Sequence, residues 1–214
     1  MKVAILGTGG VGQDLGLGFA GLGHEVKMGS RNPAKDEIKA WLGRAGKKAS
    51  AGTFGEAAAF GEVAVLATHW AGTENAVRLA GAVNLAGKIV IDATNPLAFR
   101  PNALPGLAVG GDDSAAEQVQ RWLPKAKVVK AFNTVNHAHM VKPAFPGGPP
   151  DMFICGDDEA AKKLVAGICR DFGWGVVDMG GLEAARLLEP LALVYIRNAI
   201  RTNNWNCAFK LLRK

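Results

Sequence analysis

Short runs of apolar residues alternate along the chain with longer stretches in which apolar residues recur every three or four positions. Runs such as VAIL at 3–6, VAVLA at 63–67 and IVI at 89–91 contain no polar alternation. A parallel strand covered on both faces requires this continuous apolar character. The pattern predicts strands at Lys2–Leu6, Glu25–Met28, Glu62–Ala67, Lys88–Asp92, Lys127–Phe132, Asp151–Cys155 and Val176–Met179.

The stretches between these runs have the period of amphipathic helices. Asn32 and Pro33 are typical of a helix cap and a first helical position, and Pro190 is expected either to kink the last helix or to restart it. Strands that alternate with helices predict an α/β protein with a doubly wound parallel sheet. The predicted helices are Val11–Leu22, Ala34–Ala45, Thr73–Val83, Ser114–Leu123, Glu159–Phe172 and a long apolar helix over 181–202.

Two loops rich in proline and glycine, over 104–113 and 143–150, interrupt this alternation. We take the second loop as a boundary. Residues 1–142 are expected to form a Rossmann domain, and residues 151–214 a small α+β extension. A chain of 214 residues is long enough for one domain with such an appendage.

A glycine-rich turn follows the first predicted strand and opens the first predicted helix. It reads Gly7-Thr8-Gly9-Gly10-Val11-Gly12, which is the pattern GxGxxG in the strand–turn–helix context that dinucleotide binding requires. The first glycine permits the tight turn, the second lets the backbone approach a pyrophosphate, and the third lets the helix pack on the strand. The positive end of the helix dipole then favours the anion.

The end of the second strand predicts which dinucleotide binds. An NAD site needs a carboxylate here to accept hydrogen bonds from the ribose hydroxyls, but the segment carries no acid before Asp36. Arginine pairs bidentately with a phosphate and stacks on an aromatic base. We therefore expect NADP, with the 2′-phosphate bound by Arg31 and Ser30 and with Asn32 and Lys35 close by as further cofactor-binding candidates.

Three strand ends carry polar or aromatic residues. Because ligands of open α/β sheets bind beyond the carboxyl ends of the strands, these residues are candidates for the reaction site. His69, Asn133 and His137 are candidate positioning groups, and no residue is a certain catalyst. Trp70 and Phe99 could be core residues or could stack on a ring. The three segments are Thr68-His69-Trp70, Thr94-Asn95-Pro96-Leu97 and Asn133-Thr134-Val135-Asn136-His137.

Other classes of site have weaker support. His137 and His139 form an HxH pair without a third ligand nearby, so no metal is expected. The three cysteines are widely spaced and form no CxxC, which favours buried thiols in a reducing cytoplasm. No apolar stretch reaches the length of a membrane span, and no module for nucleic-acid binding accompanies the net charge of +6.

Several segments together resemble one known family. With GTGGVG, VKMGSRNPAK, IDATNPL, KAFNTV, ICGDDEAAKK and GGLEAARLLEPLA, the chain resembles the NADP oxidoreductase, coenzyme F-420-dependent family, whose relatives include the cytosolic domains of six-transmembrane metalloreductases. The resemblance implies NADP contacts from Thr8, Gly9, Gly10, Val11, Ser30, Arg31, Thr68 and Asn95. It also implies a second redox cofactor bordered by Asn133, Thr134 and the segment near Phe209–Leu211.

The second cofactor stays open between an F-420-type deazaflavin and FMN or FAD. Archaeal deazaflavin reductases of this family carry an extra glycine in the turn and a histidine where this chain has Asn133, whereas KAFNT is similar to the metalloreductase branch. The expected reaction is hydride transfer between NADPH and that ring, carried by the cofactors themselves. The alternatives are an NADP(H) sensor without turnover and a short hydroxyacid or imine dehydrogenase.

The charge and the apolar surface of the C-terminal region give two further expectations. Residues 190–214 hold five basic residues and no acid, while residues 1–189 are nearly neutral. This basic end, with Arg197 and Arg201, would suit the anionic tail of a cofactor, although a solvated tail explains it equally well. The apolar helix around Leu187–Ile200 suggests a homodimer surface, for which core burial is the alternative.

Overall fold

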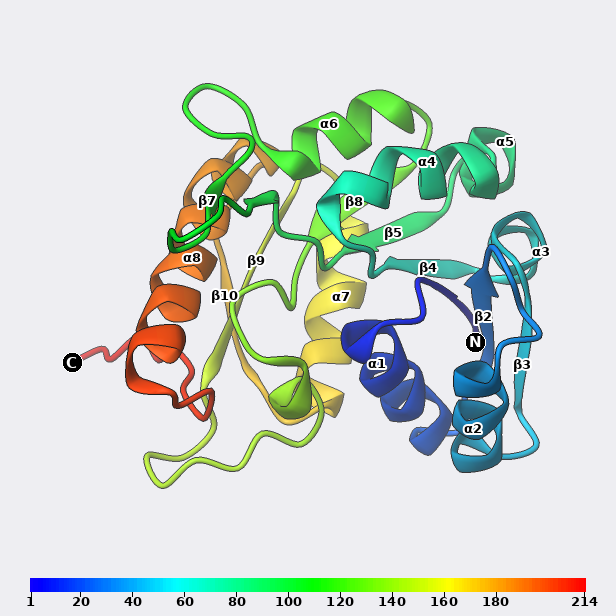
Figure 1. Cartoon of the computed structure of the whole chain (residues 1–214), viewed down its shortest axis with the longest axis horizontal. Helices are drawn as coiled ribbons and strands as arrows, with labels where there is room; N and C mark the ends of the chain where they lie inside the picture. Colours follow the sequence, from blue (N-terminus) through cyan, green and yellow to red (C-terminus); the bar gives the residue numbers. More distant parts are fainter.

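The computed structural model describes every residue from Met1 to Lys214. Its centre is one sheet of eight strands in the spatial order β10-β9-β8-β5-β4-β1-β2-β3 (Figure 1). The strands are β1 (Lys2–Leu6), β2 (Glu25–Ser30), β3 (Ala49–Thr53), β4 (Val63–Leu66), β5 (Ile89–Asp92), β8 (Lys127–Lys130), β9 (Asp151–Gly156) and β10 (Gly175–Asp178). All neighbours pair in parallel except β8 and β9, which are antiparallel. The predicted α/β fold with a doubly wound sheet is confirmed.

Helices cover both faces of this sheet. The first face carries α1 (Gly10–Gly21), α2 (Asp36–Ala45) and α7 (Glu159–Asp171). The second face carries α3 (Phe54–Phe60), α4 (Trp70–Ala80), α5 (Ala82–Leu85), α6 (Ala115–Trp122), the short turn η2 (Leu182–Ala184) and the start of α8 (Ala185–Thr202). A small antiparallel ribbon of β6 (Leu97–Ala98) and β7 (Gly106–Leu107) and a turn η1 (His137–His139) complete the chain.

The continuous apolar runs explain this layering. Successive side chains of a strand point to opposite faces of the sheet. In β1, Val3 and Ile5 join the core beneath α1, α2 and α7, whereas Ala4 and Leu6 join the core beneath α3, α4 and α6. The four positions from Val3 to Leu6 are therefore all apolar and buried because both faces are covered, whereas Lys2 at the start of the strand is exposed.

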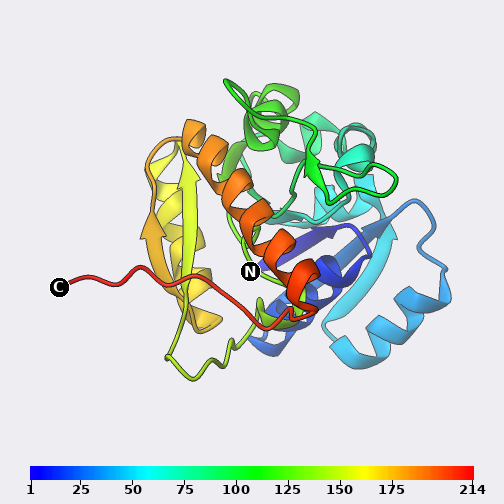
Figure 2. The same cartoon turned by 60° about the vertical axis from the view of Figure 1, so that its left-hand side comes forward.

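The C-terminal third continues the same sheet. β9 and β10 extend it beyond β8, and α8 then runs along the side of the molecule that carries the C-terminus, at the left of Figure 1 and slanting across the view of Figure 2. The division into residues 1–142 and 151–214 and the homodimer both stay predictions. Leu188, Ala192 and Ala199 on α8 are buried, while Leu187 and Val194 are 63% and 60% exposed. None of the helices is long and apolar enough to cross a membrane.

The structure corrects the start of one predicted helix and adds two elements that were not predicted. The helix expected to begin at Ala34 begins at Asp36, because Asn32 and Pro33 form a turn in which the Asn32 side chain accepts a hydrogen bond from the Ala34 amide (3.2 Å). The strand β3 and the helix α3 were not predicted at all. β3 has only small, half-exposed residues and no apolar run, and α3 is too short to show a helical period.

The last helix settles the alternatives left open for Pro190. α8 is one continuous helix of 18 residues with Pro190 inside it, so the helix does not restart at that residue. A proline removes one backbone donor from the helix and normally destabilises it. Its neighbour Glu189 is buried in contacts outside the helix, and these contacts hold this turn in place.

Two helical glycines provide a test of the packing between α1 and α2. A Cβ at Gly16 in α1 would lie 2.7 Å from Cζ2 of Trp41, which is fully buried and whose indole nitrogen donates to the Gln13 carbonyl (3.0 Å). Overpacking of this kind costs about 1–3 kcal/mol, so Gly16→Ala should lower the free energy of unfolding. At Gly167 in α7 the same Cβ meets nothing within 4 Å, so Gly167→Ala should raise it by about 0.5–1 kcal/mol. Urea unfolding of both variants would measure these changes. Equal changes in the free energy of unfolding would contradict the tight packing of Gly16 against Trp41.

Candidate functional site

The site lies where the chain changes direction across the sheet. After β1 the chain builds β2 and β3 on one side, and then returns to place β4 on the other side of β1. Ligands of open α/β sheets bind at this switch point. The backbones are close enough there that a Cβ at Gly7 would overlap the Ala67 carbonyl, and Gly7 has a φ of 136° that favours glycine.

The glycine-rich turn leaves open space at its centre. A Cβ at Gly12 would overlap the Gly7 carbonyl oxygen, so Gly12 is needed for α1 to pack against the turn. A Cβ at Gly9 would meet nothing within 4 Å. Gly9 is the N-cap of α1 and has no side chain to satisfy the first helical amides. These free amides and the positive end of the helix dipole can bind an anion.

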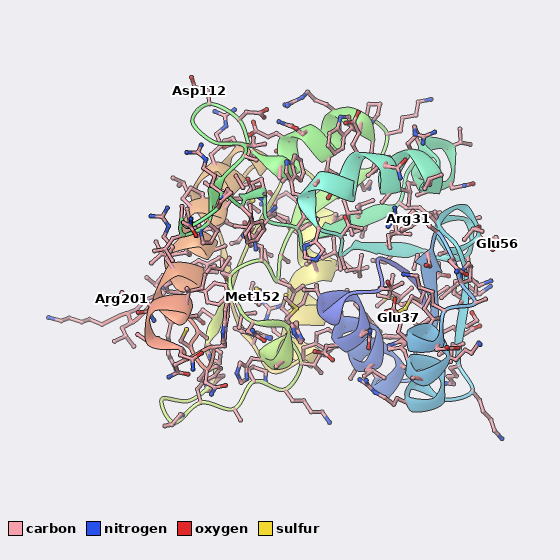
Figure 3. The ribbon with its side chains drawn as sticks, viewed as in Figure 1. Arg31, Glu37, Glu56, Asp112, Met152 and Arg201 are labelled. Carbon is pink, nitrogen blue, oxygen red and sulfur yellow. The ribbon has the colours of Figure 1, made fainter.

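The end of β2 presents a cation beside this turn. Arg31 is exposed, and Ser30 is buried with its hydroxyl bonded within the same turn, to the backbone of Asn32 (3.1 Å). Glu37, in the first turn of α2, accepts a hydrogen bond from Thr8 Oγ1 (3.1 Å) and lies 3.6 Å from Lys35 Nζ. Figure 3 shows Arg31 and Glu37 on the same side of the molecule, near β2 and α2. A phosphate bound here would compete with the Glu37 carboxylate for Thr8 and Lys35.

The end of β4 leads directly into α4. Thr68 and Thr73 share a hydrogen bond between their hydroxyls (2.9 Å), which ties the strand end to the first turn of the helix. His69 is exposed and is the N-cap of α4 without a side-chain hydrogen bond. Trp70 stacks on Trp122, with ring centroids 5.7 Å apart. Trp70 therefore both packs on a neighbouring helix and borders the cleft described below.

Two asparagines join the ends of β5 and β8. Asn95 Nδ2 donates to the Asn133 carbonyl (2.8 Å), and Asn133 Nδ2 donates to Asn95 Oδ1 (3.1 Å) and to the Leu188 carbonyl (3.0 Å). These partners fix which side-chain atom of Asn133 is nitrogen. Asn133 is 1% exposed, and its Oδ1 is buried without any hydrogen-bond partner. A buried polar atom without a partner costs about 1–3 kcal/mol, so a ligand that donates an N–H to it would relieve this cost.

One cleft of about 1170 Å³ brings most of the predicted residues together. Single small ligands usually occupy pockets of about 300–1,000 Å³, so this cleft has room for more than one. The predicted residues that line it are Gly7, Thr8, Gly9, Gly10, Val11, Ser30, Arg31, Lys35, Thr68, His69, Trp70, Asn95, Asn133 and His137. Phe99 lines it too and is 73% exposed, so Phe99 is not a core residue.

Four predicted cofactor residues do not line the cleft. Gly12 lies under the turn, against the Gly7 backbone. Asn32 caps the turn before α2 with its own side chain. Pro96 is buried, with its carbonyl bonded to the Ala108 amide (2.7 Å), and Thr134 is 2% exposed. These residues shape the site, and their direct contact with a ligand stays a prediction.

The two histidines of the HxH pair have separate partners. His137 Nδ1 lies 2.6 Å from Asp14 Oδ2 on α1, and His139 Nε2 lies 2.9 Å from Asn206 Oδ1 in the C-terminal segment. A Cβ at Gly10 would be nearly equidistant, at 2.7–2.9 Å, from three atoms of the His137 ring. The imidazole therefore presents its face to Gly10 and forms one wall of the glycine-rich turn.

The far wall of the cleft was not predicted. Tyr195, Ile196 and Ile200 from α8 and Trp205 from the segment after it line the cleft. The rings of Tyr195 and Trp205 meet edge to face, with centroids 6.1 Å apart. A sequence signal existed, because the apolar helix carries Tyr195 and is followed by Trp205, but only the fold shows that this helix returns to the strand ends.

The C-terminal tail differs from the expectation drawn from the resemblance. Phe209 to Leu211 do not line the cleft, because their backbone is bonded to Asp151 at the start of β9. Arg197 donates to the Pro105 carbonyl (3.0 Å), and Pro105 borders the cleft. Figure 3 shows Arg201 on the opposite side of the view from Arg31. Binding of an anionic tail by this basic end stays a prediction.

The fold and the site together define a Rossmann-type dinucleotide-binding protein. A family model described as "NADP oxidoreductase coenzyme F420-dependent" matches residues 2–96. The F420-dependent NADP reductase of Methanocaldococcus jannaschii is 34% identical over 212 residues, which cover 92% of this chain and 91% of that protein. The chain therefore belongs to the family of coenzyme F420-dependent NADP oxidoreductases and is an NADP-dependent oxidoreductase.

Other relatives agree with this placement. A crystal structure of a protein from Arthrobacter sp. FB24, assigned as an F420-dependent NADP reductase, superposes with a TM-score of 0.94 at 40% identity, and each chain is covered completely. The rat metalloreductase STEAP3 is 33% identical over 196 residues, which are 90% of this chain and 36% of that protein. An imine reductase of Streptomyces aurantiacus shares the fold alone, with a TM-score of 0.66 at 16% identity.

The different surroundings of Gly9 and Gly12 predict that alanine has a different effect at each position of the turn. Gly9→Ala should leave the free energy of unfolding unchanged, because its Cβ meets no protein atom, yet it should weaken NADPH binding at least tenfold by blocking the approach of the pyrophosphate. Gly12→Ala should instead destabilise the fold, because its Cβ overlaps backbone. Fluorescence titration with NADPH and urea unfolding would separate the two effects. Unchanged NADPH affinity in a stably folded Gly9→Ala variant would refute the placement.

Proposed function

We propose that this protein transfers a hydride between NADPH and the flat ring of a second redox cofactor, a deazaflavin of the F420 type. The observation that carries the proposal is the single cleft. One end holds the glycine-rich turn and Arg31, the middle holds Asn95 and Asn133, and the other end is formed by aromatic and aliphatic residues of α8. Such a cleft can hold a dinucleotide and a second ring in contact.

The residues at the first end fit NADPH. The amides at the start of α1 suit the pyrophosphate, and the empty space at Gly9 gives it access. Arg31 can pair bidentately with the 2′-phosphate, and Lys35 adds a second positive charge on the same side. His137, held by Asp14, lines the cleft and packs its ring against Gly10, so it forms one wall of the turn.

The residues in the middle of the cleft and at its α8 end fit a planar ring that carries N–H donors. When bound, nicotinamide supplies a hydride from C4 and the second ring accepts it with a proton from solvent, so that NADPH, H⁺ and the oxidised ring give NADP⁺ and the reduced ring. Asn133 offers an unpaired carbonyl oxygen to an N–H of a ligand. Tyr195, Ile196 and Trp205 offer a surface that excludes water from the reacting faces.

The choice of deazaflavin over FMN or FAD rests on the relatives. Those named F420-dependent NADP reductases match this chain along nearly their whole length, whereas STEAP3 matches over about one third of its own. Reduction of a flavin is the other outcome of the experiment below. In both cases Asn133 and α8 border the acceptor.

Parallel assays with several acceptors test the proposed function. Purified protein should oxidise NADPH, followed at its absorbance band, in the presence of the F420-type deazaflavin, and more slowly or not at all with FMN, FAD or a ferric chelate. Turnover with flavins alone would reassign the acceptor. Tight binding of NADPH without hydride transfer to either ring system would refute the proposal.

A matched pair of charge changes tests the NADP end. Arg31→Gln removes a charge-assisted hydrogen-bonding pair worth about 1.5–3 kcal/mol and should raise the Kd for NADPH roughly 10- to 100-fold, with little change for NADH. Glu37→Gln removes a carboxylate that competes for Thr8 and Lys35 and should lower the Kd for NADPH. Isothermal titration at fixed ionic strength would measure both. Equal losses of NADPH and NADH affinity in Arg31→Gln would contradict the assignment of Arg31 to the 2′-phosphate.

A further inference from the structure

Three charged side chains form a cluster that is buried beneath the cleft and does not line it. Lys130 at the end of β8 lies 2.9 Å from Asp92 Oδ2 at the end of β5 and 2.8 Å from Glu189 Oε1 on α8. Lys130 also donates to the Thr94 carbonyl (2.7 Å). Asp92 and Lys130 are 0% exposed, and Glu189 is 1% exposed.

The remaining polar atoms of this cluster are also bonded. Asp92 Oδ1 accepts hydrogen bonds from the Thr94 amide (2.9 Å) and hydroxyl (2.7 Å). The Glu189 carboxylate accepts from the amides of Ala115 (3.0 Å) and Ala116 (3.2 Å), which begin α6. Burial alone would lower the pKa of Lys130, but the adjacent carboxylates outweigh it and raise that pKa. The lysine therefore stays charged.

Stability is a weak reason for such a cluster. Each buried ion costs several kcal/mol of desolvation, and apolar residues of similar volume are often at least as stable. The arrangement does, however, fix the position of α8 relative to the strand ends and to α6. It joins the carboxyl ends of β5 and β8, the first turn of α6 and one turn of α8 with bonds that each require a fixed geometry.

The same turn of α8 is attached to the floor of the cleft. Asn133 donates to the carbonyl of Leu188, the residue before Glu189, and exchanges two hydrogen bonds with Asn95. Ile196 lines the cleft seven residues after Glu189, about 10 Å further along the helix. A tilt of a few degrees at Glu189 would move Ile196 by about half an ångström, in a reaction that needs reacting atoms about 3–3.5 Å apart.

We propose that Asp92, Lys130 and Glu189 are positioning residues that fix α8 relative to the strand ends and thereby set the width of the acceptor half of the cleft. They touch neither cofactor and act through Asn133 and through the face of α8. The identity of the ring in that half rests on the proposed function, whereas the placement of α8 does not.

Glu189→Gln is the first variant, because it leaves Lys130 and Asp92 as a neutral pair and weakens only the attachment of α8. Glu189→Asp keeps all three charges but shortens the reach, and it is the second variant should the change of charge unfold the protein. The matched control is Lys162→Met. Lys162 has a side chain that is 5% exposed and paired with Glu159 (2.8 Å) and Asp178 (3.1 Å), and it does not line the cleft.

A direct measurement of the position of α8 tests the proposal without turnover. Spin labels are placed at Val194 on α8 and Val83 on α5, which are 60% and 90% exposed. Cys207 is replaced by serine, whereas Cys155 and Cys169 can stay because burial raises the pKa of both thiols to about 12. Glu189→Gln and Glu189→Asp should shift or broaden the distance distribution, and Lys162→Met should not. A distribution unchanged from the wild type in both Glu189 variants would overturn the proposal.

Kinetics give the second readout. The Glu189 variants should keep the Kd for NADPH within about threefold, while kcat/KM for the acceptor falls roughly 10- to 100-fold. The Lys162→Met variant should be less stable than the wild type but should keep the same Kd for NADPH and the same kcat/KM for the acceptor. If Lys162→Met lowers kcat/KM equally, the effect is one of general stability and the positioning role is refuted. If the wild type reduces no acceptor, the proposed function fails while the spin-label distances still decide the role of the cluster.

Discussion

The close approach of β1 to β4 at the glycine-rich turn is the constraint on which the rest of the structure depends. Gly7 lies against the Ala67 carbonyl and Gly12 lies against Gly7, so the start of α1 is held at the one place where the sheet changes winding direction. The strand ends on both sides of this point then open into the same cleft. An NADP-dependent oxidoreductase needs such a shared opening, because the nicotinamide and the group that exchanges a hydride with it must meet in one place.

The charges of the chain are distributed in agreement with this geometry. Exposed cations, Arg31 and Lys35, lie where a phosphate would bind, and the carboxylate of Glu37 lies close enough to Lys35 to compete with it. Deeper in the molecule, Lys130 and its two carboxylates are sealed from water beneath the cleft. We propose that the surface charges select the anion, and that the buried charges set the position of the cleft walls.

Much of the fold could be predicted because strands covered on both faces are apolar at every position, and GxGxxG directly after β1 located the turn. β3 was not predicted because an edge strand of small residues carries no such run. The helix α3 was missed as well, although the capping box of Thr53 and Glu56 was a signal that could have located it. The far wall of the cleft and the buried cluster could not be predicted for a different reason. Glu189 contacts Lys130, which lies 59 positions earlier in the sequence. In the sequence alone, Glu189 is only a polar residue within an apolar helix, and nothing indicates its partner.

The fate of an isotope shows whether a hydride passes directly between two rings held in this cleft. In a single turnover with NADPH deuterated at one face of C4, we expect one of the two labelled forms to deliver its deuterium to C5 of the reduced deazaflavin, as measured by mass spectrometry. Appearance of the deuterium in solvent from both labelled forms would contradict direct transfer between rings held in contact.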